Sequence, residues 1–526
     1  MAKEPISRRG FLKRSLWTGA GIGGVALAGG GVYKLLRVRD IEKLVGAYPG
    51  GAEHHALEIV NGSAPRPNIV LIYCDDLGYG DVGCFGNSVI RTPHVDSLAA
   101  EGTRFTEYYA CNAVCAPSRA GLLTGRYPLR TGIIGNTYPE NEPVGRRMAR
   151  NFGVMLKHLG VLDIREEYVA RGIDAAEITL AEALKVAGYR TGMMGKWHLG
   201  DYSTNQDFNP LRHGFDYYFG VPYSNDMRPL PLYRNETELD ADLDSGEKQA
   251  KLTGRYTEEA VRFIENSSGG PFFLYLAHTF PHQPLFPSER FEKQSRAGKF
   301  GDVVEEIDWS VGEILKCLER NGLDRNTLLI FTSDNGPWYE GSTGSLRGRK
   351  GQSYEGGFRV PFIARWPGNI PRGSENAAPV MNIDLYPTLL SLAGVGLPRD
   401  RIVDGKDIMP LLTGTRTQSP HDALYFFHYD QLEGIRAGRW KYFDKLHRYT
   451  WPIALDAAVV PNKLGADQLG DRWPLLYDIK RDPGESYNVI NTYPDVAEQL
   501  KKKMDTFRNL MAENPRGFKN RSSSAM

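Results

Sequence analysis

From residue 67 onwards, the chain alternates short apolar runs with longer amphipathic stretches, and this alternation constrains the fold more than any other feature. The run Asn68–Tyr73 is apolar and rich in β-branched residues, which is typical of a strand buried on both faces. The runs Pro271–Leu276 and Thr327–Thr332 have the same character, and Asp302–Leu318 between them carries apolar residues at helical spacing. Strands that alternate with helices predict an α/β fold, with a parallel or mostly parallel sheet covered by helices on both faces.

Two further segments fit this alternation. Thr179–Ala187 is predicted to be a helix with Thr179 as its N-cap, and Thr191–Gly195 is predicted to be the next strand. Later in the chain the pattern becomes shorter and more mixed, which indicates a smaller C-terminal α+β subdomain. We therefore expect a main domain, a C-terminal subdomain and a flexible tail over residues 67–414, 415–514 and 515–526.

The first 36 residues have the pattern of a targeting signal. Residues 7–13 read Ser-Arg-Arg-Gly-Phe-Leu-Lys, and an uncharged stretch rich in Gly and Ala follows over residues 15–33. This order resembles a bacterial twin-arginine export signal, whereas a single membrane span is disfavoured by so many glycines. The resemblance implies recognition by the twin-arginine export machinery and a periplasmic or secreted protein, unless an uncleaved signal remains as an anchor. Residues 37–66 are expected to be a linker.

The composition excludes several classes of protein. Lys+Arg 64 against Asp+Glu 63 gives a net charge of +1, so the chain lacks the basic excess of nucleic-acid-binding proteins. Five cysteines in 526 residues cannot form a disulfide scaffold. The 41% of hydrophobic residues is typical of globular proteins with a sizeable core.

Oxygen-bearing side chains follow two of the predicted strands. Asp75 and Asp76 come just after the first strand, and Asp334 and Asn335 come just after Thr327–Thr332. Ligands of open α/β sheets bind outside the carboxyl ends of the strands, so these side chains converge if the two strands are neighbours. Such hard oxygen donors favour Ca²⁺ or Mg²⁺, although Asp-Asn-Gly is also common in turns.

A cysteine comes just before the place where a helix is expected to begin. The run from Cys115 to Arg126 reads Cys-Ala-Pro-Ser-Arg-Ala-Gly-Leu-Leu-Thr-Gly-Arg, and Pro117 suits the first helical turn. A helix N-terminus with Arg119 nearby favours anions and would lower the pKa of the thiol. The alternative is a buried structural cysteine.

This twelve-residue run resembles the signature of the sulfatase family, in which the cysteine is oxidised to Cα-formylglycine by a formylglycine-generating maturation enzyme. The run Gly188–Gly200 resembles the second signature of the family, and four shorter matches follow the family order. The resemblance extends from about residue 67 to residue 490. It implies an alkaline phosphatase-like fold and an arylsulfatase-like hydrolase of sulfate esters. The shorter matches are Leu71–Asp81, Thr332–Gly336, Leu346–Gly357 and Leu476–Asn488.

The resemblance also implies roles for individual residues. A divalent cation, Ca²⁺ in most relatives, would be held by Asp75, Asp76, Asp334 and Asn335 with the residue made from Cys115. Arg119 would orient that residue, and Lys196 and Lys350 would clamp the sulfate. Lys196 and His198, two residues apart, would share one face of a strand. Ser224 would contact the sulfate, by a weaker match to the arylsulfatase A branch.

Hydrolysis would begin with attack on sulfur by one hydroxyl of the hydrated aldehyde, a gem-diol, and pass through a covalent sulfate. His282 would protonate the leaving oxygen, and His198 would then take a proton to release sulfate. His278 is a second candidate for the acid, since it follows the same predicted strand.

Two other functions fit parts of this pattern. A related phosphonate or phosphodiester hydrolase would share the cation ligands, and a sulfated-glycan or sulfated-lipid binding protein would have lost one of the reactive residues. The substrate is expected to be a sulfated small molecule or glycan, and aryl, sugar and steroid sulfates all remain compatible with the sequence.

Overall fold

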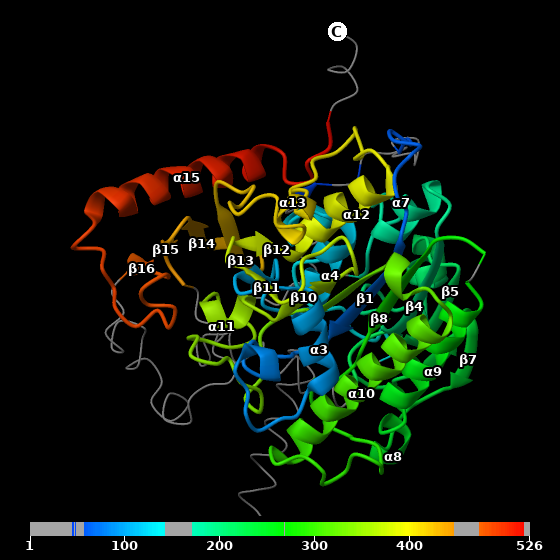
Figure 1. The fold of residues 1–526 in the computed structure, drawn as a ribbon. Helices are drawn as coiled ribbons and strands as arrows, with labels where there is room; N and C mark the ends of the chain where they lie inside the picture. Colours follow the sequence, from blue (N-terminus) through cyan, green and yellow to red (C-terminus); the bar gives the residue numbers. More distant parts are fainter. Residues whose placement is uncertain are drawn as a thin grey trace, which may run out of the picture.

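The computed structural model describes residues 45, 46, 48, 57–141, 171–267, 269–446 and 473–519, and its centre is a ten-stranded mixed sheet (Figure 1). The strands lie in the order β11-β2-β10-β9-β1-β8-β4-β5-β6-β7. Neighbours from β9 to β5 are all parallel, while β10, β6 and β7 introduce antiparallel pairs. The predicted α/β fold with a mostly parallel sheet is therefore confirmed.

The predicted strands and helices lie where the apolar runs placed them, within a few residues. The sheet strands are β1 (Asn68–Cys74), β2 (Thr103–Phe105), β4 (Arg190–Lys196), β5 (Tyr217–Val221), β6 (Leu232–Arg234), β7 (Thr237–Asp240), β8 (Phe272–Ala277), β9 (Thr327–Ser333), β10 (Phe362–Arg365) and β11 (Ser374–Asn376). The helices of this domain are α3 (Pro93–Glu101), α4 (Cys115–Thr124), α5 (Pro128–Thr131), α7 (Leu180–Val186), α8 (Gly246–Gln249), α9 (Leu252–Glu265), α10 (Gly298–Arg320), α11 (Glu355–Phe358), α12 (Leu385–Ala393) and α13 (Met409–Leu412). Two short strands, β3 (Tyr108–Tyr109) and β12 (Val380–Met381), pair with each other.

Helices cover both faces of the sheet (Figure 1). The buried side chains of β1 accordingly alternate between two apolar clusters, one on each face. Leu71 belongs to the apolar cluster that includes residues of α4, α7 and α12, whereas Ile72 belongs to the cluster that includes residues of α3, α9 and α10. Thr179 caps α7 as predicted, since its hydroxyl accepts a hydrogen bond from the backbone of Glu182, whose carboxylate accepts one from the backbone of Thr179.

A four-stranded antiparallel sheet follows the main domain. Its strands are β13 (Leu424–His428), β14 (Gln431–Ala437), β15 (Trp440–Phe443) and β16 (Leu475–Asp478), and the long helix α15 (Pro494–Glu513) packs against it. This is the smaller C-terminal α+β unit expected from the sequence. The exact domain bounds remain predictions.

The predicted export signal, most of the predicted linker and the end of the predicted tail lie outside the described residues. Within the described part of the chain, no helix is both long and apolar enough to cross a membrane.

Candidate active site

The two oxygen-rich segments meet at the carboxyl end of the central sheet. Strands β1 and β9 pair in parallel, with Cys74 opposite Ser333, so the residues after each strand lie together. The backbone N–H of Asp76 donates to Oδ1 of Asp334 over 3.1 Å, and Nδ2 of Asn335 donates to Oδ1 of Asp76 over 2.7 Å. The structure thus brings Asp75, Asp76, Asp334 and Asn335 together, and all four side chains are buried.

Helix α4 brings Cys115 to the same place. Cys115 is the first residue of the helix rather than the residue before it, and every residue of α4 is buried. Its Sγ lies 3.3 Å from Oδ1 of Asp75 and 3.8 Å from Oδ1 of Asp76. The thiol therefore lies in contact with the carboxylates.

One expectation about this thiol is wrong. The helix N-terminus and Arg119 were expected to lower its pKa, but burial and the neighbouring Asp75 raise the pKa of Cys115 well above its usual value, despite Lys196 and Lys350. Burial and the adjacent carboxylate destabilise the thiolate more than the helix N-terminus stabilises it. An unmodified Cys115 would be a protonated, unreactive thiol.

Three cationic side chains pair with the three carboxylates. Lys196 Nζ lies 2.5 Å from Oδ2 of Asp75, and Lys350 Nζ lies 2.9 Å from Oδ2 of Asp76 and 3.2 Å from the sulfur of Cys115. Arg119 donates through Nη2 to Asp334 over 2.8 Å and through Nη1 to the backbone oxygen of Lys196 over 3.0 Å. Buried charges need such partners.

The pairing leaves the carboxylates in different protonation environments. Burial alone would raise the pKa of Asp75, but Lys196, His282 and Arg119 outweigh it and hold the pKa well below its usual range. Burial and the negative charge of Asp75 raise the pKa of Asp334 to about 7, although Arg119 opposes this. A divalent cation at the site would favour the ionised form of both acids.

A glycine next to the last residue of β4 lies close against β8. Gly195 has a φ of +111°, and a Cβ there would lie 1.8 Å from the backbone oxygen of Ala277 on β8. The strand ends at Lys196, and His198 lies beyond it with a φ of 61°. The expectation that Lys196 and His198 share a face of one strand is therefore wrong, because the chain turns between them.

The proton of the His198 ring can be placed from its surroundings. Nε2 lies 3.3 Å from the backbone oxygen of Thr137, which can only accept, so Nε2 carries the proton. Nδ1 is buried and has no hydrogen-bond partner among the described residues. Burial, Lys196 and Arg119 lower the pKa of His198 well below its usual value. The ring is thus a neutral acceptor at neutral pH.

Of the two histidines that follow β8, His282 lies at the site. Its Nε2 is 3.8 Å from Oδ2 of Asp76, and the hydroxyl of Ser224 is 3.4 Å from its Nδ1. His278 is fully buried, both of its ring nitrogens lack partners among the described residues, and burial lowers its pKa to about 3. A histidine that stays neutral at pH 7 cannot serve as the acid, so the geometry favours His282.

The donor atoms of this site suit a hard divalent cation. Among the described residues, Asp75, Asp76, Cys115 and His282 form a group whose potential ligand atoms lie within 4.8 Å of one another. Oδ1 of Asn335 is buried without a hydrogen-bond partner in the described part of the chain, and Oδ1 of Asp334 accepts one hydrogen bond and keeps a lone pair. Carboxylate and amide oxygens left in this state are ligands for Ca²⁺ or Mg²⁺.

Several residues of the site had no signal in the sequence. Thr137 holds His198 through its backbone oxygen, and Asn225 and Gln249 lie behind His282. Thr137 acts through a backbone atom, which no residue pattern marks. Asn225 directly follows Ser224, and this adjacency was the only available hint.

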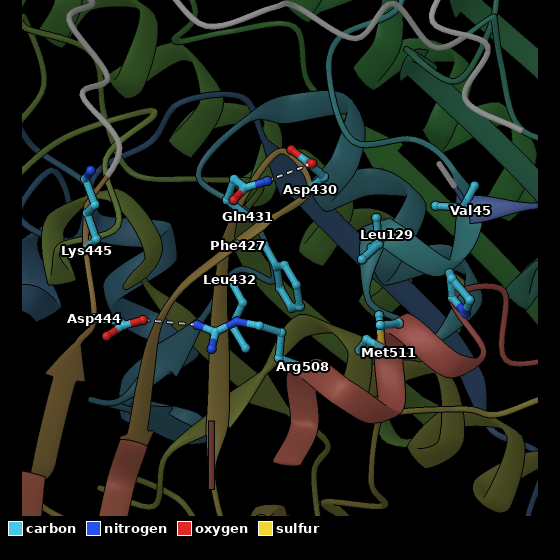
Figure 2. A pocket seen from close by; sticks show the side chains of 12 residues that line it. Val45, Leu129, Phe427, Asp430, Gln431, Leu432, Asp444, Lys445, Arg508 and Met511 are labelled. Carbon is cyan, nitrogen blue, oxygen red and sulfur yellow. Dashed lines mark hydrogen bonds and ion pairs between the residues drawn. The ribbon is translucent and has the colours of Figure 1, made fainter. Parts of the chain in front are cut away.

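A separate cavity of about 550 Å³ is lined by residues of the C-terminal part of the chain together with Val45 and Leu129 (Figure 2). Apolar side chains such as Phe427 and Met511 line it together with two polar pairs, Arg508 with Asp444 and Gln431 with Asp430. None of its lining residues belongs to the site described above.

Comparisons with known proteins agree with this geometry. The sequence matches the sulfatase family over residues 67–395, the C-terminal region of N-sulphoglucosamine sulphohydrolase over residues 349–451 and the C-terminal region of aryl-sulfatase over residues 419–526. The chain belongs to the sulfatase family, and it is accordingly a sulfuric ester hydrolase that acts on sulfate esters.

Individual relatives cover most of the chain. It is 38% identical to N-acetylgalactosamine-6-sulfatase of Canis lupus familiaris, over 84% of this chain and 85% of that one. It is 37% identical to human arylsulfatase A, over 83% of this chain and 87% of that one. Among solved structures, a Bacteroides thetaiotaomicron protein titled BT33336S-sulf has a TM-score of 0.70 at 29% identity, covering 85% of this chain and 100% of that one. The predicted alkaline phosphatase-like fold is thus confirmed.

Proposed function

We propose that the protein hydrolyses sulfate esters with a divalent cation and with Cα-formylglycine made from Cys115 by a maturation enzyme. The observation that carries this proposal is the convergence of Cys115, Asp75, Asp76 and Lys350 in one cluster of buried side chains. Asp75, Asp76, Asp334 and Asn335 would hold Ca²⁺ or Mg²⁺. When bound, the cation would polarise a sulfate oxygen, and the hydrated aldehyde would supply the attacking hydroxyl.

The cationic side chains of the pocket prepare it for an anion. Lys196 and Lys350 each lie within 3 Å of a carboxylate, and their charges would offset the negative charge of the sulfate and of the transition state. Arg119 holds the Asp334 carboxylate through Nε and Nη2 and so fixes its direction. Ser224 would contribute a hydroxyl on the side of His282.

The two histidines would handle protons in opposite directions. His282 would donate a proton to the departing alcohol or phenol oxygen. His198, whose Nδ1 keeps a free lone pair, would accept a proton from the residue at position 115 as sulfate leaves. The opposite roles agree with their surroundings, since His282 lies beside Asp76 while His198 is neutral and near Lys196 and Arg119.

The substrate is proposed to be a sulfated small molecule or glycan. One solved relative, 27% identical with a TM-score of 0.68, is described in complex with k-i-k-neocarrahexaose, and curated relatives are named for N-acetylgalactosamine-6-sulfate and steryl sulfate. The N-terminal sequence further supports export to the periplasm or beyond by the twin-arginine machinery.

The experiment is an assay of protein co-produced with a formylglycine-generating enzyme. Aryl, sugar and steroid sulfates would be tested beside a phosphonate monoester and a phosphodiester. We expect hydrolysis of at least one sulfate class, loss of that activity on chelation, and no turnover by Cys115→Ala. Faster hydrolysis of the phosphonate or phosphodiester, or full activity in Cys115→Ala, would contradict the proposal.

A further inference from the structure

One ring nitrogen of His282 contacts two oxygen acceptors that lie outside the group of proposed catalytic residues. Its Nδ1 lies 3.1 Å from Oδ1 of Asn225 and 2.5 Å from the backbone oxygen of Gln283. An amide oxygen and a carbonyl oxygen can only accept, so Nδ1 is the nitrogen that carries a proton and donates. The other nitrogen, Nε2, is the one that faces Asp76.

The amide of Asn225 can take only one of its two orientations. Its Nδ2 donates to the backbone oxygen of Pro284 over 2.9 Å and to Oε1 of Gln249 over 3.3 Å. A flipped amide would place its oxygen against the carbonyl of Pro284, so the nitrogen must stay on that side. Oδ1 of Asn225 is therefore left for His282.

Gln249 fixes the orientation of the Asn225 amide. Its Nε2 donates to the backbone oxygens of Asn225 and Leu243, each over 3.2 Å, which leaves Oε1 as the acceptor for Asn225. Asn225 and Gln249 are both completely shielded from solvent. Burying two amides in one chain of hydrogen bonds is costly unless every group is satisfied, and a satisfied chain of this kind holds one geometry.

We propose that Asn225 and Gln249 are positioning residues that set the direction of His282. Donation runs in one sense, from the ring through Asn225 and Gln249 to the carbonyls of Pro284 and Leu243. It keeps one proton on Nδ1, so that the second proton of the imidazolium is carried by Nε2, which would point at the leaving oxygen. Both side chains are shielded from solvent, so neither would reach a bound substrate. Outer partners of this kind typically contribute ~10–100-fold to the action of the group that they orient. The inference rests on the proposed role of His282 as the acid.

The test uses aryl sulfates whose phenols differ in acidity, from 4-nitrophenyl to 4-methoxyphenyl sulfate, on the mature, metal-loaded enzyme. The slope of log kcat/KM against phenol pKa measures how much the leaving oxygen depends on a proton donor. We expect His282→Ala to steepen this slope. Asn225→Leu should steepen the slope less than His282→Ala does, and its kcat/KM should fall ~10–100-fold more on the poorest leaving group than on nitrophenyl sulfate. Gln249→Leu should steepen the slope less than Asn225→Leu.

Two controls separate positioning from general damage to the fold. Asn68→Leu removes another buried amide, at the opposite end of β1, and should leave the slope unchanged even if it lowers stability. In the double variant His282→Ala with Asn225→Leu, the slope should equal that of His282→Ala alone, because residues that act as a unit are not additive.

The outcomes distinguish the inference from the proposed function. If His282→Ala steepens the slope while Asn225→Leu and Gln249→Leu do not, the positioning chain is refuted and the role of His282 stands. If His282→Ala itself leaves the slope unchanged, His282 is not the acid and the inference falls with it. Should Asn225→Leu fail to fold, the slope of Gln249→Leu decides.

Discussion

Nδ2 of Asn335 lies 2.7 Å from Oδ1 of Asp76, and this contact commits the amide of Asn335 to one orientation. The same nitrogen donates to the backbone oxygen of Gly336 over 2.9 Å, so Oδ1 of Asn335 is left buried without a hydrogen-bond partner among the described residues. A buried acceptor without a partner costs about 1–3 kcal/mol. A cation coordinated by this oxygen would recover that cost.

The first prediction follows from this oxygen. Ca²⁺ at about 100 times its Kd should stabilise the protein by ~2.7 kcal/mol, because it binds the folded state alone. Asn335→Ala should weaken this effect, and Asp334→Ala should remove it together with turnover. Thermal unfolding with and without Ca²⁺ measures both variants. An equal Ca²⁺ effect in Asp334→Ala and the unaltered protein would place the ion elsewhere.

The second prediction concerns position 115. The buried Cys115 thiol has a raised pKa and is a poor nucleophile, so activity should require its conversion to the aldehyde. Mass measurement of the peptide that spans residues 115–126 should show the aldehyde in proportion to specific activity. Cys115→Ser, which cannot supply the second hydroxyl, should not turn over. Fully active protein that contains only unmodified cysteine would rule out this chemistry.

The third prediction separates the histidines by the pattern of their defects. Removing His282 should slow alcohol sulfates ~10²–10⁴-fold more than nitrophenyl sulfate, because a nitrophenol leaves without much help from an acid. Removing His198 should impair all substrates alike and allow the sulfated enzyme to accumulate. Steady-state rates on both substrate types, with His278→Ala as the matched control, test this. A selective defect in His278→Ala rather than His282→Ala would reverse the assignment.

The fourth prediction is a pH dependence of stability remote from the active site. Burial, with Asp96 and Glu305 nearby, raises the pKa of Asp308 on α10 to about 7, although its carboxylate accepts from the backbone of His94 and Val95. The folded state thus binds this proton more tightly than the unfolded chain, whose Asp has a pKa of about 3.9. The stabilisation is present below about pH 4 and is lost as the pH rises through about 7.

Asp308→Asn tests this, since it keeps an acceptor for the two N–H groups but cannot ionise. Compared with the unaltered protein, the variant should gain thermal stability at pH 8 relative to pH 5. A stability difference between the two proteins that does not vary with pH would contradict the shift.

The strand ends could be predicted because they depend on local patterns. Apolar runs placed β1 and β9, and the residues just beyond them identified Asp75 and Asp334. The partners of these residues depend on non-local packing. Burial reversed the expected pKa shift of Cys115, and a left-handed residue at His198 separated it from the strand of Lys196. Asn225 and Gln249 come from different elements, so only the folded chain brings them together.

The burial of Cys115 has a consequence for the order in which the protein is made. The residue is 1% exposed, at the start of a helix that is buried along its whole length. On the proposed chemistry, a maturation enzyme has to bind the segment around Cys115 and oxidise its thiol. In the folded molecule both the segment and the thiol are buried. On that chemistry, modification would precede folding of the main domain. A molecule that folds first would be permanently inactive, however correct its structure.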